Sequence, residues 1–135
     1  MKVTRGVLTA IEEHARREAP HECCGLLLGT ATGIVEAVPA RNIAAEPARR
    51  YEMAPDDHFA ALRRCRSEGE GLSVVGGYHS HPRSAAVPSA TDLEQAFQEF
   101  VYVIAGPVDA SAPLQVRAYQ LRDGALAPVI LSISD

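Results

Sequence analysis

Three segments of the chain repeat apolar residues at the spacing of an amphipathic helix. The first covers residues 5–20 and ends at Pro20. The second begins at Pro55, which suits a helix start, and runs to the glycine-rich stretch 67–71, and the third covers residues 89–97. The expected apolar faces of the second and third helices are Phe59, Leu62 and Cys65, and Leu93, Ala96 and Phe97.

Short apolar or alternating runs bounded by turn residues predict the β-strands. These runs lie at 22–30, 33–44, 49–55, 72–82, 100–106, 114–121 and 125–133. Turn signals at Gly106-Pro107 and Asp123-Gly124 separate the last three runs. Helices and strands in mixed order predict an α/β or α+β fold, in which three helices flank a mixed β-sheet of about six strands.

Length and composition describe an ordinary globular chain. Its 135 residues contain no repeat, low-complexity segment or linker, so we expect one domain over residues 1–135. The net charge of −4 gives no general attraction to nucleic acid or to anionic membranes. No apolar run has the length of a signal peptide or a membrane span. We therefore expect neither nucleic acid nor membrane as a partner.

The three cysteines form a poor disulfide framework, because their number is odd and two of them are adjacent. A reducing cytoplasm suits such a chain better. Cys23, Cys24 and Cys65 are expected to pack as small apolar side chains. His14 and His58 lie in helical segments rich in charge, so we expect both to face solvent.

Two histidines end the predicted strand 72–82, in Gly-Tyr-His-Ser-His-Pro. Residues at i and i+2 of a strand share a face, so His79 and His81 can offer two imidazoles to one point. Asp92 follows 92 − 81 = 11 residues later, in the first turn of the next predicted helix. Two nitrogens and one oxygen are a normal protein ligand set for catalytic zinc, with the fourth position left to water. We expect one Zn²⁺ per chain.

The same residues have a structural interpretation. In Pro-Ser-Ala-Thr-Asp, Ser89 is a plausible N-cap and Asp92 its partner at the third helical position, as in a capping box. Capping explains this pair, but it does not explain the H-x-H pair at the end of a buried strand. Other H-x-H enzymes fit less well, because a zinc nucleobase deaminase needs H-x-E with P-C-x-x-C, and an amidohydrolase barrel needs a longer chain.

Hydrolysis at a zinc site also requires a proton carrier that is not itself a ligand. Glu22 is a candidate, since it stands at the start of the apolar run Cys-Cys-Gly-Leu-Leu-Leu-Gly. From the residues alone, a solvated glutamate at a strand start is an equally good interpretation.

Taken together, Glu22 with Gly25, His79-Ser80-His81-Pro82, and Ser89 with Asp92 resemble the JAMM metalloprotease motif of MPN domains. The motif is a glutamate, then H-x-H, seven residues, serine, two residues and aspartate, and nothing in it is missing here. The resemblance covers nearly the whole chain and implies the MPN architecture, which is similar to that of cytidine deaminases. It implies zinc binding by His79, His81 and Asp92.

The resemblance also implies the remaining roles and a substrate class. Glu22 would be the general acid/base and Ser89 would donate a hydrogen bond to the oxyanion. Ser80 points to the opposite face and receives no catalytic role. The chain is most similar to the short stand-alone prokaryotic members. These imply an isopeptidase or peptidase that cleaves after the C-terminal glycines of a ubiquitin-like sulfur-carrier protein, to release a residue, a peptide or a cysteine.

Two alternatives remain open at this point. One is a non-catalytic MPN-type scaffold, although such modules normally lack a ligand, and the other is a zinc amidase or dipeptidase for small substrates. The sequence does not determine the oligomeric state, so a homodimer also stays open. It does not identify the carrier or show whether the loop from Arg41 to Arg50 closes over a groove.

Overall fold

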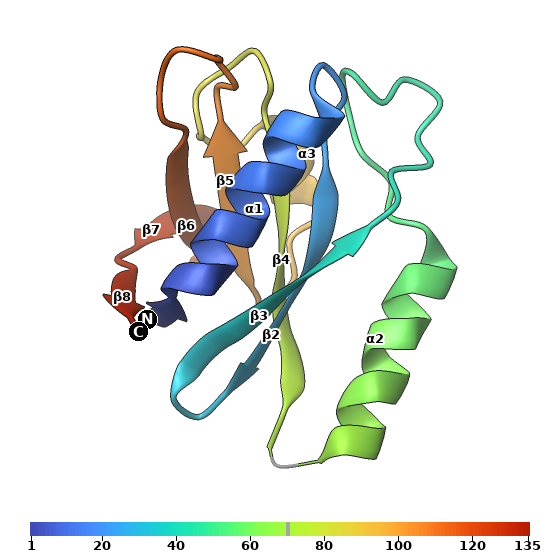
Figure 1. Cartoon of the computed structure of the whole chain (residues 1–135), viewed down its shortest axis with the longest axis vertical. Coiled ribbons are helices and arrows are strands. Elements are labelled where there is room, and N and C mark those ends of the chain that lie inside the picture. Colours follow the sequence, from blue (N-terminus) through green and yellow to red (C-terminus); the bar gives the residue numbers. More distant parts are fainter. Residues whose placement is uncertain (70) are drawn as a thin grey trace.

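The computed structural model describes residues 1–69 and 71–135 and shows one mixed sheet with three helices (Figure 1). The strands of the sheet run in the order β7-β6-β5-β4-β2-β3-β1-β8. Along the chain, the elements are β1 (Lys2–Thr4), α1 (Arg5–Glu18), β2 (Cys24–Thr30), β3 (Gly33–Ala40), α2 (Pro55–Glu68), β4 (Ser73–Ser80), α3 (Ala90–Glu94), β5 (Val101–Gly106), β6 (Gln115–Arg122), β7 (Ala125–Val129) and β8 (Ser132–Ser134).

The α+β fold with three helices around a mixed sheet is as expected, but the strand count differs. The described residues form eight strands rather than about six. Two of them, β1 and β8, were not predicted because three residues are too few for a periodic signal. The segment 125–133 supplies two strands, and β8 pairs in parallel with β1 at the opposite edge from β7. The strand expected at 49–55 is wrong: within this stretch only Met53 forms an isolated bridge, to Asn42.

Strand β4 lies in the middle of the sheet, antiparallel to β2 and parallel to β5. Gly76 permits the close approach of β5, because a Cβ at this position would overlap the carbonyl oxygen of Val101. Two paired neighbours leave β4 little freedom. The side chains at the end of β4 are therefore held on a rigid element.

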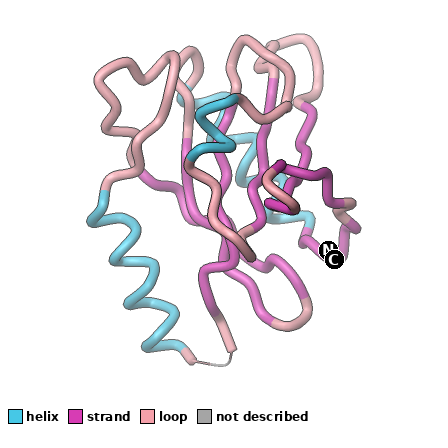
Figure 2. Tube along the Cα trace, turned by 180° about the vertical axis from the view of Figure 1, so that it is seen from behind, coloured by secondary structure: helices cyan, strands magenta, loops and turns pink. Residues whose placement is uncertain are grey.

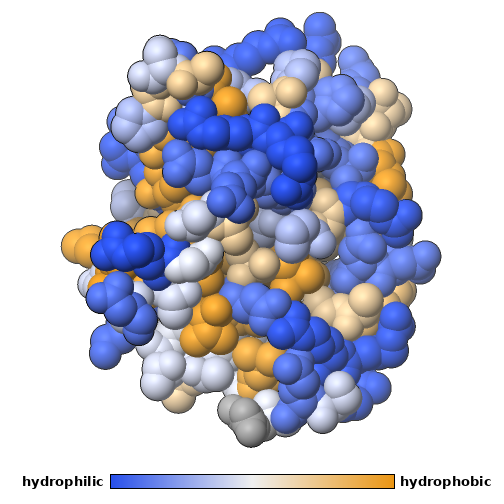
Figure 3. Space-filling view, viewed as in Figure 1, coloured by the Kyte–Doolittle hydropathy of each residue, from blue (hydrophilic) through white to orange (hydrophobic). Residues whose placement is uncertain are grey.

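Helix α1 covers one face of the sheet and α3 lies on the opposite face (Figures 1 and 2). Thr4 caps α1 by accepting a hydrogen bond from the Val7 amide at 3.3 Å. The main core lies under α1, where its apolar residues pack against strand residues such as Leu27 and Val103. The outward surface of α1 is hydrophilic (Figure 3). No helix among the described residues is both long and apolar enough to cross a membrane.

His14 is buried, so the expectation that it faces solvent is wrong. Its Nδ1 lies 2.8 Å from the hydroxyl oxygen of Tyr78, a residue of β4. Burial lowers the pKa of His14, and the nearby charge of Arg17 adds to this effect. The neutral ring thus links α1 to the central strand.

The expected apolar faces of the second and third helices are only partly buried. On α2, Cys65 packs inward together with Ala61, whereas 57% of Phe59 is exposed. Helix α3 ends at Glu94 rather than near residue 97, and Phe97 is 67% exposed. The amide of Phe97 donates to the hydroxyl oxygen of Tyr102 at 2.6 Å instead of continuing the helix.

Candidate active site

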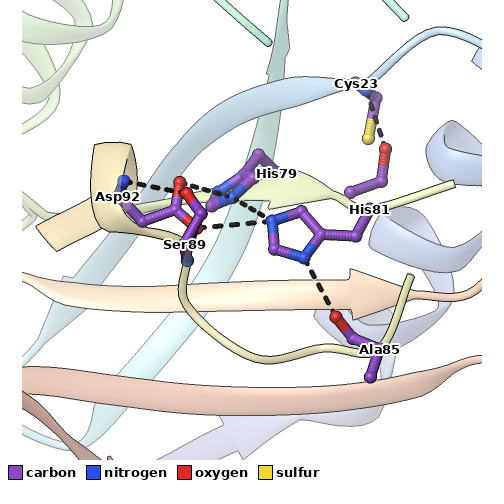
Figure 4. Close-up of polar contacts among 7 residues, drawn as sticks. Cys23, His79, His81, Ala85, Ser89 and Asp92 are labelled. Carbon is purple, nitrogen blue, oxygen red and sulfur yellow. Dashed lines mark hydrogen bonds and ion pairs between the residues drawn. The ribbon is translucent and has the colours of Figure 1, made fainter. Parts of the chain in front are cut away.

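The two histidines lie at the end of β4, where the strand leaves the sheet. His79 pairs with Cys24 of β2 and Ile104 of β5, and His81 follows just after the strand. Both are buried. Asp92 belongs to the first turn of α3, on the face of the sheet to which the histidines point (Figure 4). The strand end and the helix start are therefore brought together by one short connection.

Three donor atoms converge at this point. His79 Nε2 is 3.1 Å from one carboxylate oxygen of Asp92, and His81 Nε2 is 3.3 Å from the other. The two Nε2 atoms are themselves 3.2 Å apart, and all the possible ligand atoms lie within 4.8 Å of one another. Two imidazole nitrogens and a carboxylate oxygen that face one another can together hold one metal ion.

A second hydrogen bond orients His81. Its Nδ1 lies 3.0 Å from the carbonyl oxygen of Ala85, which can only accept a hydrogen bond. The Nδ1 proton therefore points to Ala85, and Nε2 faces Asp92 at the centre of the site, where it donates to the carboxylate when protonated and offers a lone pair to a metal when neutral. Such an outer partner fixes the tautomer of a metal-binding histidine.

Asp92 is ionised in this environment. Burial alone would raise the pKa of its carboxyl, but the hydrogen bonds from His79 and His81 outweigh burial and hold the pKa well below its usual range. The amide of Ser89 also donates to the carboxylate, at 2.8 Å. Asp92 therefore offers a charged ligand rather than a neutral one.

Ser89 and Asp92 form the capping box that their spacing suggests. The Asp92 amide donates to Ser89 Oγ at 3.1 Å, in return for the bond from the Ser89 amide. The box holds the Asp92 side chain in place and leaves Ser89 itself exposed beside the histidines. Capping and a site role are thus compatible for both residues.

Glu22 lies half-buried in the segment just before β2. Burial, together with the carboxylate of Asp92, raises the pKa of its carboxyl to about 7, against the lowering effect of a charged His81. The charges of His81 and Asp92 therefore act on this carboxyl. A carboxyl with a pKa near neutrality can both take up and release a proton.

Ser80 has a role that its position between the histidines did not reveal. It points to the opposite face, as expected, where its Oγ accepts a hydrogen bond from the amide of Cys23 at 2.8 Å. The carbonyl of Cys23 accepts in turn from the amide of Ser80, at 3.1 Å. Ser80 thus closes the ladder between β2 and β4 and fastens the segment that carries Glu22.

Tyr51 completes the site from the loop between β3 and α2. Its ring stacks on that of His79 with centroids 4.7 Å apart and planes inclined by 29°. The sequence pattern placed Tyr51 in a strand and offered no signal for this contact. The loop thus supplies one wall of the site.

A groove of about 880 Å³ runs from Tyr51 along the same face of the sheet. Apolar and aromatic side chains dominate its lining, among them Leu26, Met53, Phe97, Phe100 and Tyr102. His58 also lines the groove and is half-buried rather than solvent-facing. Thr91, next to Asp92, brings the groove to the edge of the site.

Comparison with known proteins agrees with this geometry. Residues 4–121 match the family described as prokaryotic homologs of the JAB domain. The chain is 41% identical over 104 residues to a desampylase of Haloferax volcanii, covering 75% of this chain and 73% of the relative. It is 37% identical over 122 residues to a probable TtuB-protein conjugate cleaving protease of Thermus thermophilus, covering 90% and 76%.

A third relative is a CysO-cysteine peptidase of Mycobacterium tuberculosis, 30% identical over 125 residues, with 89% of this chain and 82% of the relative covered. The crystal structure of a JAB1/MPN domain protein from Archaeoglobus fulgidus shares the fold with a TM-score of 0.66 at 24% identity, covering all of both chains. The family match spans most of the chain, including all five residues of the motif. The chain therefore belongs to the family of prokaryotic homologs of the JAB domain.

Proposed function

We propose that the protein is a zinc-dependent peptidase or isopeptidase that hydrolyses the amide bond after the C-terminal glycines of a ubiquitin-like sulfur-carrier protein. The observation that carries this proposal is the convergence of His79, His81 and Asp92. The charges of His81 and Asp92 also act on the carboxyl of Glu22, whose pKa is raised to about 7, mainly by burial. The relatives' names support the substrate class, because they describe enzymes that cleave such conjugates or release cysteine. The buried free cysteines suit a reducing cytoplasm.

The donor set selects the metal. His79 and His81 provide two imidazole nitrogens and Asp92 one carboxylate, which suits Zn²⁺ better than Mg²⁺ or Ca²⁺. When bound, zinc lowers the pKa of a coordinated water from 15.7 to about 7. We expect one ion per chain.

Glu22 is the proton carrier in this proposal. With a pKa of about 7 its carboxyl is partly ionised at neutral pH, so it can accept a proton from the attacking water. The same carboxyl then returns the proton to the departing amine. A glutamate with an ordinary pKa would be a weaker base in the first step.

Ser89 is the residue that stabilises the oxyanion of the tetrahedral intermediate in this proposal. A serine hydroxyl has one donor and two acceptor positions. The capping bond from the Asp92 amide uses only an acceptor position, at 3.1 Å. The O–H therefore remains available as a donor to the developing negative charge.

The groove lined by Leu26, Met53 and Tyr102 is the expected path of the carrier's tail. Strands β2 and β4 each have two paired neighbours, so the tail cannot extend the sheet beside the site by pairing with them. We infer that it lies across the sheet, under the loop that carries Tyr51.

The test uses purified, zinc-loaded protein and two versions of one ubiquitin-like carrier. The first version has an extra residue after Gly-Gly and the second is joined through Gly-Gly to a lysine of another protein. Mass spectrometry is expected to show cleavage immediately after the second glycine. The relative rates decide between tail trimming and the release of conjugates.

Glu22→Gln is expected to reduce cleavage to a low residual rate, and chelation is expected to abolish it, with recovery when zinc is added back. Glu18→Gln is the matched control, because Glu18 is an exposed acid four residues upstream. Full cleavage by the Glu22→Gln protein contradicts the assigned mechanism. Turnover of small dipeptides without any cleavage of the carrier favours the small-substrate amidase instead.

A further inference from the structure

The loop between β3 and α2 closes around the side chain of Asn42. Asn42 Oδ1 accepts hydrogen bonds from the amides of Ala44 at 3.0 Å and Glu52 at 3.1 Å. Its Nδ2 donates to the carbonyl of Arg50 at 3.1 Å. One side chain thus joins the two ends of loop 43–52.

The same amide also reaches the proposed proton carrier. Asn42 Nδ2 donates to the main-chain carbonyl of Glu22 at 3.0 Å. The amide of Glu22 donates to the carbonyl of Pro47, in the middle of the loop, at 2.8 Å. The main chain of Glu22 is therefore bonded on both sides to the loop and its organising residue.

An asparagine is well suited to this position. All contacts of Nδ2 are with carbonyl oxygens, including a longer one to Pro47 at 3.4 Å, and all contacts of Oδ1 are with amides. The orientation of the amide group is therefore determined by its surroundings. Aspartate has the same shape but no donor, so it would place an oxygen against the carbonyl of Glu22.

Loop 43–52 also carries Tyr51, whose ring stacks on His79 and borders the groove. We propose that Asn42 is a positioning residue that holds Glu22 in its catalytic place and ties it to the loop over the groove. A tail that orders the loop thereby also orders the proton carrier. This inference rests on the proposed function and adds to it a residue outside the motif.

The test compares Asn42→Asp and Asn42→Ala with Arg41→Gln. Asn42→Asp keeps the acceptor for the loop amides and loses the donor to Glu22. Arg41→Gln removes an exposed ion pair to Asp57 at the base of the same loop and leaves Glu22 untouched. The expected result for Asn42→Asp is a kcat lower by about 10- to 100-fold, with KM within about twofold. Arg41→Gln retains the wild-type kcat.

A double-mutant cycle separates positioning from a general structural effect. In a Glu22→Gln background, Asn42→Ala is expected to cause no further loss of residual activity, because it acts through Glu22. Zinc content, measured per chain, is expected to stay unchanged in every Asn42 variant. A multiplicative loss in the cycle, a lost metal, or an unchanged kcat for both Asn42 variants overturns the proposal.

Amide hydrogen exchange gives a readout that needs no substrate. In the Asn42→Ala protein, hydrogen exchange is expected to be faster at the main-chain amides of Glu22 and Glu52. The main-chain amide of Val7 in α1 is expected to keep its rate. An unchanged exchange rate at the Glu22 amide contradicts the positioning of Glu22 by Asn42, whatever the substrate proves to be. A wild-type protein inactive on every carrier contradicts the proposed function alone.

Discussion

The ring of Tyr51 stacks on that of His79, with centroids 4.7 Å apart. A loop residue thereby covers one of the three converging side chains of the site. The contact brings together a segment without regular structure and the central strand β4. It makes the loop part of the site, although no catalytic group comes from it.

Replacing Tyr51 tests whether its ring contributes to binding of the carrier. Tyr51→Ala removes a stacked pair worth about 0.5–1.5 kcal/mol and opens the inner end of the groove. KM for the carrier is expected to rise by roughly 3- to 10-fold, while Tyr51→Phe stays close to the wild type. Steady-state kinetics on the carrier measures both, and an equal effect of the two variants would show that the hydroxyl, not the ring, matters.

The pH dependence of the rate reports on Glu22. Its carboxyl must be ionised to accept a proton, so activity is expected to rise with pH until the carboxyl is fully ionised. The midpoint is expected at or below about 7, because the positive charge of bound zinc lowers the pKa from the metal-free value. A profile of kcat/KM against pH measures the midpoint, and a flat profile between pH 5 and 8 speaks against Glu22 as the base.

Glu22 also costs the metal-free protein stability. Its folded-state pKa of about 7 lies above the usual value of 4.5 for a glutamate. Between these values the folded chain keeps a proton that the unfolded chain releases, so the free energy of unfolding falls as pH rises through this window. Metal-free Glu22→Gln is therefore expected to be more stable than the wild type at pH 8, with the difference shrinking toward pH 4. Urea unfolding at both pH values measures it.

Ser89 has two roles that can be separated. Ser89→Ala is expected to lower kcat by about 100- to 1000-fold through the lost oxyanion donor. It is also expected to cost about 1 kcal/mol of stability through the lost cap. Thr4→Ala is the matched control, because Thr4 caps α1 far from the motif and its loss lowers stability alone. If the kcat of Ser89→Ala is close to that of Thr4→Ala, Ser89 caps the helix and does not stabilise the oxyanion.

Zinc binding is expected to stabilise the fold. A ligand at 100 times its Kd adds about 2.7 kcal/mol to the free energy of unfolding. Thermal unfolding should therefore shift upward with added zinc and not with magnesium, and Asp92→Ala should remove most of the shift. An equal shift in the Asp92→Ala protein would place the metal elsewhere.

Much of the site could be predicted because its signals are local. The i, i+2 spacing puts His79 and His81 on one face of a strand, and the spacing of Ser89 and Asp92 describes a helix cap. Glu22 was harder, since only the complete motif distinguished it from a solvated acid. The structure adds the electrostatic reason for it, a half-buried carboxyl beside Asp92.

His14, Asn42 and Tyr51 show why the rest could not be predicted. The charged neighbours of His14 suggested solvent, but its partner Tyr78 is 64 residues away. Asn42 is the only asparagine of the chain, and its hydrogen bonds depend on how loop 43–52 folds back. Hydrophobic periodicity describes neighbours within an element, and none of these contacts is of that kind.

The sequence by itself therefore determined the fold class and the candidate ligands, because strand alternation and helix capping act over short distances. The reaction class came from the resemblance of the complete motif to the JAMM family. Tertiary structure alone decided which face of the sheet became the site, how Glu22 gained its raised pKa, and which loop covers His79. These depend on burial and on contacts between distant segments. Both arise only when β2, β4 and the loop after β3 pack together.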